Sequence, residues 1–178
     1  MGGYESIKRV CSFYVSSVHL ITMIVPYIKR QLALNIGMTT FYEYNLKNKA
    51  EEILDKIILP DEERTAMLSV DWNSKNAYKF SEIEKELKKN LKENKELNIL
   101  ITGDNKYIEA ANENLENFFM KNMKKIEGKY ITIINCYEVT QFNDNVKDIL
   151  DAHDVILNTS GIHKISDVFE GYTRKVVV

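Results

Sequence analysis

Short apolar runs alternate with longer amphipathic stretches along the whole chain. Residues 10–14, 97–102 and 130–136 form compact runs rich in apolar, β-branched and aromatic side chains, which are typical of strands. Between such runs, apolar residues such as Leu20 and Ile24 recur every three or four positions, which is typical of a helix with one buried face. Because strands and helices alternate, the pattern predicts βαβ units and a mostly parallel sheet covered on both faces.

The predicted fold class is a single three-layer α/β/α domain with a mostly parallel sheet of about six strands. Pro26 predicts a kink inside the first helix, and Gly37 stands where that helix is expected to end. We expect strands at 10–14, 38–42, 67–72, 97–102, 130–136 and 155–157, and helices at about 17–35, 46–57, 81–94, 107–125 and 145–152. We also expect a turn or short helix at 60–63. The domain is expected to span residues 8–163, preceded by an N-terminal tail at 1–7. Residues 164–178 would form a C-terminal tail or an extra strand, with 175–178 as the candidate strand.

Size and composition indicate one cytoplasmic domain. The chain has 178 residues, 44% of them hydrophobic and 28% charged, which is enough to bury a core without disulfides or metals. Cys11 and Cys136 cannot form a disulfide framework, so we expect both to be reduced. The N-terminus has no apolar run typical of a signal peptide, and the longest apolar stretch, residues 18–28, is too short to span a bilayer. We expect no membrane association.

The charge balance gives no reason to expect a nucleic-acid partner. The net charge is -2, from 24 Lys and Arg against 26 Asp and Glu, whereas nucleic-acid binding usually shows a basic excess or stripe. The mixed runs at 82–95 and 121–125 are interpreted as solvated helix faces.

The ends of the predicted strands are the expected place for a ligand. In a parallel α/β sheet, ligands bind beyond the carboxyl ends of the strands, and a small-molecule pocket combines aromatic walls with a few polar groups. Aromatic residues at strand ends also commonly pack in the core, which is the alternative interpretation. The residues chosen as pocket members are Tyr14, Glu43, Trp72, Asp104, Tyr137 and His163.

The junction between the first strand and its helix lacks the residues that bind a nucleotide. A phosphate-binding loop needs Gly-x-x-x-x-Gly-Lys-[Ser/Thr] at this point, but residues 13–19 read FYVSSVH, without glycine or lysine. The Gly-x-Gly-x-x-Gly motif is absent as well. The sequence therefore argues against ATP hydrolysis.

Other candidate chemistry is weaker. No Cys-x-x-Cys pair is present, and we expect buried, inert cysteines with no metal and no cofactor. His19 and His153 are interpreted as structural, His153 because it follows a helix end where a cation offsets the dipole. A hydrolase or transferase that uses Cys136 or Glu43 with His163 remains an alternative.

Several segments together resemble the MEDS (methanogen/methylotroph sensory) domain over residues 8–163. The resemblance rests on residues 9–14 with 24–28, on 40–43, on 99–104, and on 134–138 with Phe142, 149–150, His153 and 158–161. Arg9 stands where the family usually has His, Glu138 where it has Asp, and Asp154 where it has Pro.

The resemblance implies a RecA-like core without ATPase motifs and a sensory role for small hydrocarbon derivatives. It places Glu43 where RecA-like ATPases carry their catalytic glutamate. No output domain is expected within these 178 residues, so signalling would use another protein or a homodimer. The leading hypothesis is a non-enzymatic sensor that binds a small, partly apolar molecule and shifts a helix or terminal segment that a partner protein contacts. A ligand-free scaffold or adaptor is the other alternative.

Overall fold

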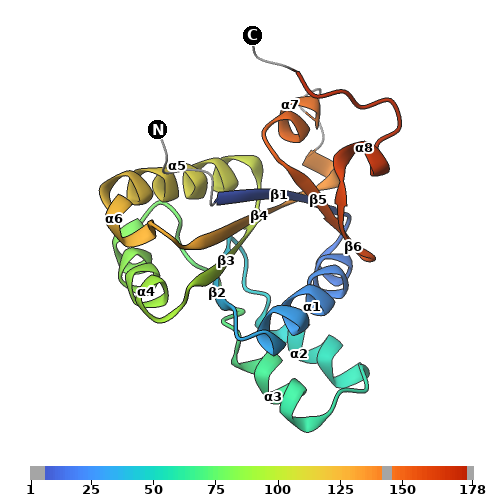
Figure 1. The fold of residues 1–178 in the computed structure, drawn as a ribbon. Coiled ribbons are helices and arrows are strands. Elements are labelled where there is room, and N and C mark those ends of the chain that lie inside the picture. The colour runs from blue at the N-terminus through green and yellow to red at the C-terminus, as the bar shows by residue number, and fades with distance from the viewer. Residues whose placement is uncertain (1–6, 142–145, 176–178) are drawn as a thin grey trace.

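The computed structural model describes residues 7–141 and 146–175 and shows an α/β domain with six strands in one sheet (Figure 1). The strands are β1 (Ile7–Tyr14), β2 (Gly37–Tyr42), β3 (Glu96–Gly103), β4 (Tyr130–Glu138), β5 (Val155–Asn158) and β6 (Gly161–Lys164). The helices are α1 (Ser17–Ala33), α2 (Lys47–Lys56), α3 (Asp61–Ser69), α4 (Phe80–Glu93), α5 (Asn105–Lys121), α6 (Met123–Ile126), α7 (Val146–Asp151) and α8 (Ile165–Val168), with a 3-10 turn at Val139–Gln141.

The strand order in the sheet is β2-β3-β4-β1-β5-β6. The first five strands are parallel to their neighbours, and β6 runs antiparallel to β5. The predicted fold class is therefore confirmed: one α/β domain, a mostly parallel sheet, and helices that alternate with strands.

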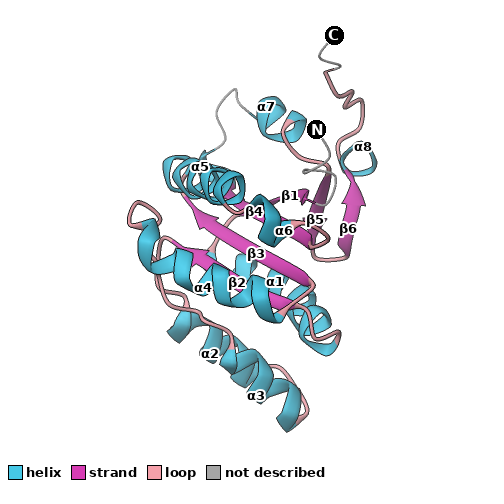
Figure 2. Cartoon of the chain, turned by 60° about the vertical axis from the view of Figure 1, so that its left-hand side comes forward, coloured by secondary structure: helices cyan, strands magenta, loops and turns pink. Residues whose placement is uncertain are grey.

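Helices cover both faces of the sheet, and each face has its own core (Figures 1 and 2). On one face, α1, α2 and α3 pack on strand residues such as Val10 and Ile134, which are fully buried. On the other face, α4 and α5 pack on residues such as Phe41 and Ile133. Alternation along each strand sends successive side chains to opposite cores, which is why the strands read as continuous apolar runs.

The connections leave β1 and β4 toward different faces. From β1 the chain continues through α1, whereas from β4 it continues toward α7, whose Leu150 belongs to the core on the opposite face. Since β1 and β4 are neighbours, a topological switch point lies between their carboxyl ends.

The expected strand at 67–72 is wrong. Pro60 precedes three carboxylates, Asp61, Glu62 and Glu63, in the first turn of α3, where negative charge is favourable, and the helix continues to Ser69. The apolar side chains beyond it belong to an extended connection that forms one bridge, between Tyr42 and Ser74. The sixth strand is instead β6, whose first residue, Gly161, adopts a positive φ of 118.

Two helix ends also differ from the prediction. The first helix ends before Asn35, which adopts a positive φ of 54, and Gly37 opens β2. The helix expected at 107–125 begins earlier, after the N-cap Asp104, and breaks at Asn122 before α6.

At the C-terminal side, α8 continues the domain, because Ile165 is buried and Phe169 and Tyr172 pack against the core that contains α5. Phe142 and residues 176–178 lie outside the described residues.

None of the helices in the described part of the chain is long and apolar enough to cross a membrane.

Candidate functional site

A pocket of about 440 Å³ opens at the carboxyl ends of β1, β3 and β4, on the face covered by α1 and α2. Its volume lies within the range of small-molecule sites. We refer to it as the strand-end pocket. It is lined by Tyr14, Ser17, Leu20, Tyr44, Asn45, Leu46, Asn48, Lys49, Thr102 and Glu138.

The strand-end pocket lies at the topological switch point of the sheet. Tyr14 and Glu138, the last residues of β1 and β4, are register partners, and both line the pocket. The helices that follow these two strands pack on opposite faces, so their departure leaves room between the strand ends. The position of the pocket is therefore the one that the fold itself favours for a ligand.

The floor of the pocket combines a neutral phenol with apolar side chains. Thr102 Oγ1 donates a hydrogen bond to the Tyr14 hydroxyl at 3.2 Å, which leaves the Tyr14 proton available to a ligand. Burial raises the pKa of Tyr14 to about 12, against the effect of the Thr102 hydrogen bond, so the phenol stays protonated. Leu20 and Leu46 are 2% and 6% exposed and supply the apolar part.

The rim of the pocket is acidic. Tyr44 is 66% exposed, and the nearby Glu43 carboxylate is the main cause of its raised pKa, with smaller contributions from partial burial, Asp104 and Glu138. The lining cation, Lys49, is engaged by Glu52 through a 2.7 Å ion pair. This arrangement favours a neutral or cationic ligand over an anionic one.

Glu43 and Asp104 organise the start of α5 beside the pocket. Glu43 Oε2 accepts a 2.6 Å hydrogen bond from the Asp104 amide, and Asp104 Oδ1 accepts from the Tyr107 amide at 2.8 Å. The close approach of Glu43 requires Gly103, because a Cβ atom there would lie 2.8 Å from Glu43 Oε2 and 2.6 Å from Tyr107 Cδ1. Both carboxylates thus satisfy amides at a helix N-terminus.

The β1–α1 junction satisfies its own amides in a similar way. The Val15 amide donates to His19 Nδ1 at 3.1 Å, and the His19 amide donates to Ser16 Oγ at 3.2 Å. A phosphate-binding loop presents such amides to its ligand. Here the side chains of His19 and Ser16 accept hydrogen bonds from these amides instead.

The six residues predicted from the sequence do not come together in one crevice. Tyr14 lines the strand-end pocket, and Glu43 and Asp104 lie beside it without lining it. The other three lie elsewhere. Trp72 is 2% exposed and stacks on Tyr42. Tyr137 packs on Phe13 and His153 in the core on the opposite face of the sheet, and His163 lies on β6 with its Nε2 2.7 Å from Ser160 Oγ.

Several lining residues were missed, for different reasons. Tyr44 and Glu138 follow predicted strands, so the rule that ligands bind at strand ends includes both. They were missed because the neighbouring residues Glu43 and Tyr137 were chosen as pocket members instead. Ser17, Leu20, Asn48 and Lys49 belong to α1 and α2. Their contribution depends on how these helices pack over the sheet, and no local motif in the sequence signals it.

The structure does not form the pairing on which the enzyme alternative depended. His163 lies on the edge strand β6, whereas β1 and β5 separate it from Cys136 on β4, and Glu43 follows β2 at the opposite edge. Three strand spacings amount to roughly 14 Å. Burial raises the pKa of the Cys136 thiol, and it raises that of Cys11 to about 12, so both are protonated. No group of three or more metal-binding side chains occurs in the described residues.

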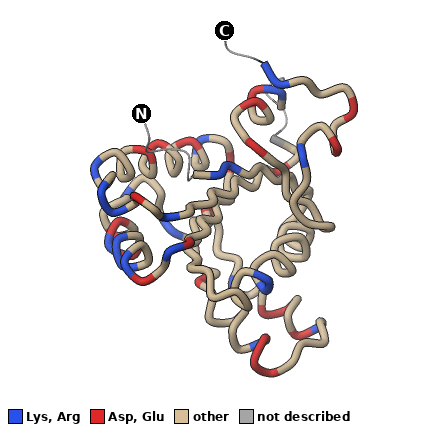
Figure 3. Tube along the Cα trace, in the orientation of Figure 1, with Lys and Arg blue, Asp and Glu red and all other residues tan. Residues whose placement is uncertain are grey.

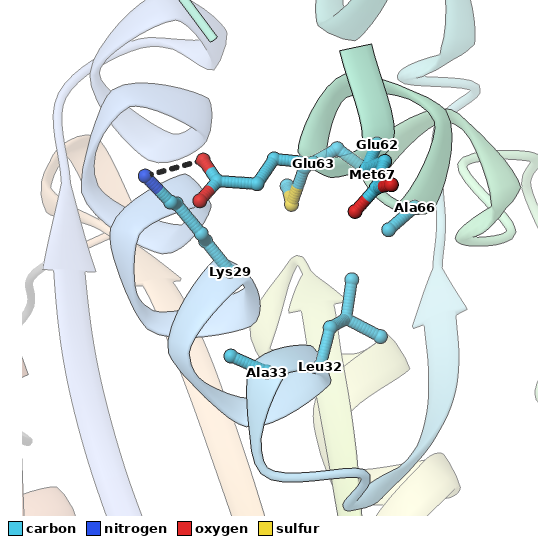
Figure 4. Close-up of a pocket in the computed structure, with 7 residues that line it drawn as sticks. All are labelled: Lys29, Leu32, Ala33, Glu62, Glu63, Ala66 and Met67. Atoms are coloured by element: carbon cyan, nitrogen blue, oxygen red, sulfur yellow. Dashed lines mark ion pairs between the residues drawn. The ribbon is translucent and has the colours of Figure 1, made fainter. Parts of the chain in front are cut away.

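A second, smaller pocket of about 170 Å³ lies between α1 and α3 (Figure 4). Lys29 and Glu63 form a 2.6 Å ion pair at one side of it, and Leu32 faces Ala66 and Met67 across the opening. Nothing at this α1–α3 pocket combines convergent polar groups with strand ends, so the strand-end pocket is the candidate site.

Comparison with known proteins adds no identification. No family model matches the chain, and a search of curated proteins finds no match.

Proposed function

We propose that this chain is a non-enzymatic sensory module of the cytoplasm that binds a small, partly apolar molecule in the strand-end pocket. The observation that carries the proposal is the pocket at the switch point, with an apolar floor, a protonated Tyr14 and an acidic rim. The occupied amides of the β1–α1 junction support binding without nucleotide hydrolysis.

The family we propose is the MEDS domain. The six-stranded, mostly parallel sheet, with β1 between the later strands β4 and β5, is compatible with the RecA-like core that the resemblance implies. The position that the resemblance gives to the catalytic glutamate of RecA-like ATPases holds Glu43, whose carboxylate binds the Asp104 amide. This role for Glu43 fits a core that has kept its architecture and lost ATPase chemistry.

The chemistry of the pocket narrows the ligand class. Glu138 and the nearby Glu43 and Asp104 disfavour carboxylates and phosphates, whereas Leu20 and Leu46 favour an apolar body. Thr102 and Tyr14 offer a hydroxyl pair for one hydrogen-bonding group. A small alcohol, amide or amine with an apolar portion therefore suits the site best.

The α2–α3 pair offers a route for the signal. Asn48 and Lys49, in the first turn of α2, line the pocket, and α2 leads directly into α3. The two helices project away from the sheet beyond α1 (Figures 1 and 2), and the Lys29–Glu63 ion pair links α3 to α1. The α2–α3 connection carries the fully exposed Ile58, a contact point for a partner protein or a second copy. A ligand that contacts α2 would shift this pair by binding one of its positions more tightly.

A thermal-shift screen tests the proposal. The library consists of small alcohols, amides and amines with apolar groups, with MgATP included. At a concentration of a hundred times the dissociation constant, a ligand stabilises the folded state by about 2.7 kcal/mol, which raises the melting temperature of a domain of this size by roughly 5 °C or more. The fluorescence emission of Trp72 gives a second readout, because its backbone carbonyl accepts a hydrogen bond from the amide of Leu46, which lines the strand-end pocket.

Two matched variants assign any binding to the pocket. Tyr44→Ala removes an aromatic rim residue that is 66% exposed, and Tyr78→Ala removes one that is 65% exposed elsewhere. We expect the first to weaken ligand binding at least fivefold and the second to leave it unchanged. A screen without hits, hits that Tyr44→Ala leaves intact, or stabilisation by MgATP would refute the proposal.

A further inference from the structure

Positive charge is concentrated at the end of the domain opposite the strand-end pocket. Residues 85–95 and 121–129 contain nine lysines and three glutamates, which leaves 15 basic and 23 acidic residues in the rest of the chain. Figure 3 shows the basic positions gathered over α4 and α6. The net charge of -2 is therefore the sum of a strongly basic region and an otherwise acidic protein.

The lysines line a concave surface. A hollow of about 620 Å³ is bordered by Lys88, Lys89 and Lys92 of α4, by Lys125 of α6, and by Lys129 before β4. Leu91 and Glu93 complete its lining. We refer to this surface as the basic groove.

Most of this charge is not neutralised within the protein. Lys88 pairs with Glu84 at 2.8 Å, and Lys129 Nζ donates to the carbonyl of Asn94. Across residues 7–141 and 146–175, no carboxylate lies within ion-pair distance of Lys89, Lys92 or Lys125. The dipole of α4 favours Lys92 at its C-terminus, but it does not account for the lysines that line the same hollow from α6 and from the segment before β4.

We propose that the basic groove binds an acidic segment of a partner protein. Lysines gathered around one hollow repel each other, and an extended run of carboxylates would relieve that repulsion. Met123, in the same segments, is 52% exposed, so an apolar residue of the partner segment finds a contact beside the charges.

The composition of the groove favours a polypeptide over nucleic acid. Residues 85–95 and 121–129 contain no arginine, the side chain suited to bidentate phosphate binding. The ammonium of Lys95 lies 5.7 Å from the ring centroid of Tyr130, so this aromatic face is already engaged and is a poor platform for a base. An anionic membrane is also a poor fit, because lysines that line a hollow do not present a flat surface.

The basic groove and the strand-end pocket lie at opposite ends of the sheet, so binding in one does not require binding in the other. The strand-end pocket lies at the carboxyl ends of β1, β3 and β4, whereas the basic groove lies where β3 and β4 begin. Each site can be tested with the other unoccupied.

Binding of fluorescent poly-L-glutamate, followed by anisotropy, tests the groove. We expect saturable binding at low salt that weakens as ionic strength rises, because the Debye length falls to about 10 Å at 0.1 M. The variant K89E/K92E/K125E should bind about tenfold more weakly or worse, because three modest surface ion pairs with the polymer can no longer form. The neutral variant K89Q/K92Q/K125Q should be weakened less.

A matched control separates the groove from net charge. Lys79, Lys106 and Lys164 are exposed lysines outside it, and K79E/K106E/K164E changes the net charge by the same amount. We expect this variant to bind like the parent protein. Equal weakening in both triple variants, or no poly-L-glutamate binding at low salt, would overturn the proposal. Tighter binding of a single-stranded oligonucleotide or of phosphatidylserine vesicles would overturn it in favour of that partner class.

Discussion

Two buried tyrosine hydroxyls differ in their hydrogen bonding. Tyr107 donates its hydroxyl proton to the Lys75 carbonyl at 2.6 Å, whereas the hydroxyl of Tyr42 is buried without a hydrogen-bond partner among the described residues. Tyr107→Phe should therefore lower the free energy of unfolding by about 1 kcal/mol, and Tyr42→Phe should leave it unchanged or raise it. Urea denaturation of both variants checks this. A larger decrease in Tyr42→Phe than in Tyr107→Phe would show that the Tyr42 hydroxyl has a partner.

His153 should make stability depend on pH. It is 4% exposed; its Nδ1 lies 2.6 Å from the Ile149 carbonyl, and its Nε2 lies 2.9 Å from Asn135 Nδ2. Both contacts suit a neutral ring that donates from Nδ1 and accepts at Nε2. Burial is the main cause of its lowered pKa; Arg9 and Arg174 lower it further, while the hydrogen bond to Ile149 and Asp154 act against the shift.

The sign of the pH effect follows from that lowered pKa. Below the unfolded value of 6.5, the unfolded chain binds a proton that the folded protein does not, so stability falls as pH falls toward the folded pKa. The slope is at most about 1.4 kcal/mol per pH unit. Denaturation between pH 7.5 and 5 should show the slope in the parent and in His163→Gln, but not in His153→Gln. An unchanged slope in His153→Gln would exclude His153 as its source.

At the scale of elements, the turn from β3 into α5 depends on one glycine. A Cβ atom at position 103 would press on Tyr107 and on the Glu43 carboxylate, so Gly103→Ala should cost about 1–3 kcal/mol of stability. The cost should be partly relieved in a Glu43→Ala background, because the carboxylate oxygen at 2.8 Å is removed, whereas Tyr107 Cδ1 at 2.6 Å and the Cβ of residue 43 at 2.9 Å remain. Chemical denaturation of the four proteins measures this coupling. Equal costs in both backgrounds would contradict the geometry.

Elements with strong local signals could be predicted from the sequence. The run of apolar residues at 97–102 lies within β3, and the helical spacing of Leu20 and Ile24 is found in α1, where both side chains are buried. The segment at 67–72 was wrongly predicted as a strand because its apolar side chains are buried by tertiary packing. Met67 and Trp72 are both buried although no strand connects them. Hydrophobicity alone does not separate a helix end followed by an extended link from a short strand.

The whole molecule determines which strand-end residues share a pocket. The sequence predicts that ligands bind at the carboxyl ends, and Tyr14 was identified on that basis. The pocket excludes three other predicted residues, Trp72, Tyr137 and His163. The sheet face on which a side chain lies, and the order of the strands in the sheet, depend on long-range pairing, such as the position of β1 between β4 and β5. The charge segregation between the basic groove and the acidic rim likewise emerges only after folding brings α4 and α6 together.

The central claim is that the hollow at the switch point is where this protein binds its ligand. Backbone NMR of the labelled protein with the tightest compound from the thermal-shift screen tests it most directly. We predict shifts centred on the amides of Tyr14, Leu46, Thr102 and Glu138, weaker shifts along α2, and none for MgATP at residues 15–17. Shifts centred on the α1–α3 pocket or the basic groove, or a MgATP response at the β1–α1 junction, would contradict the account.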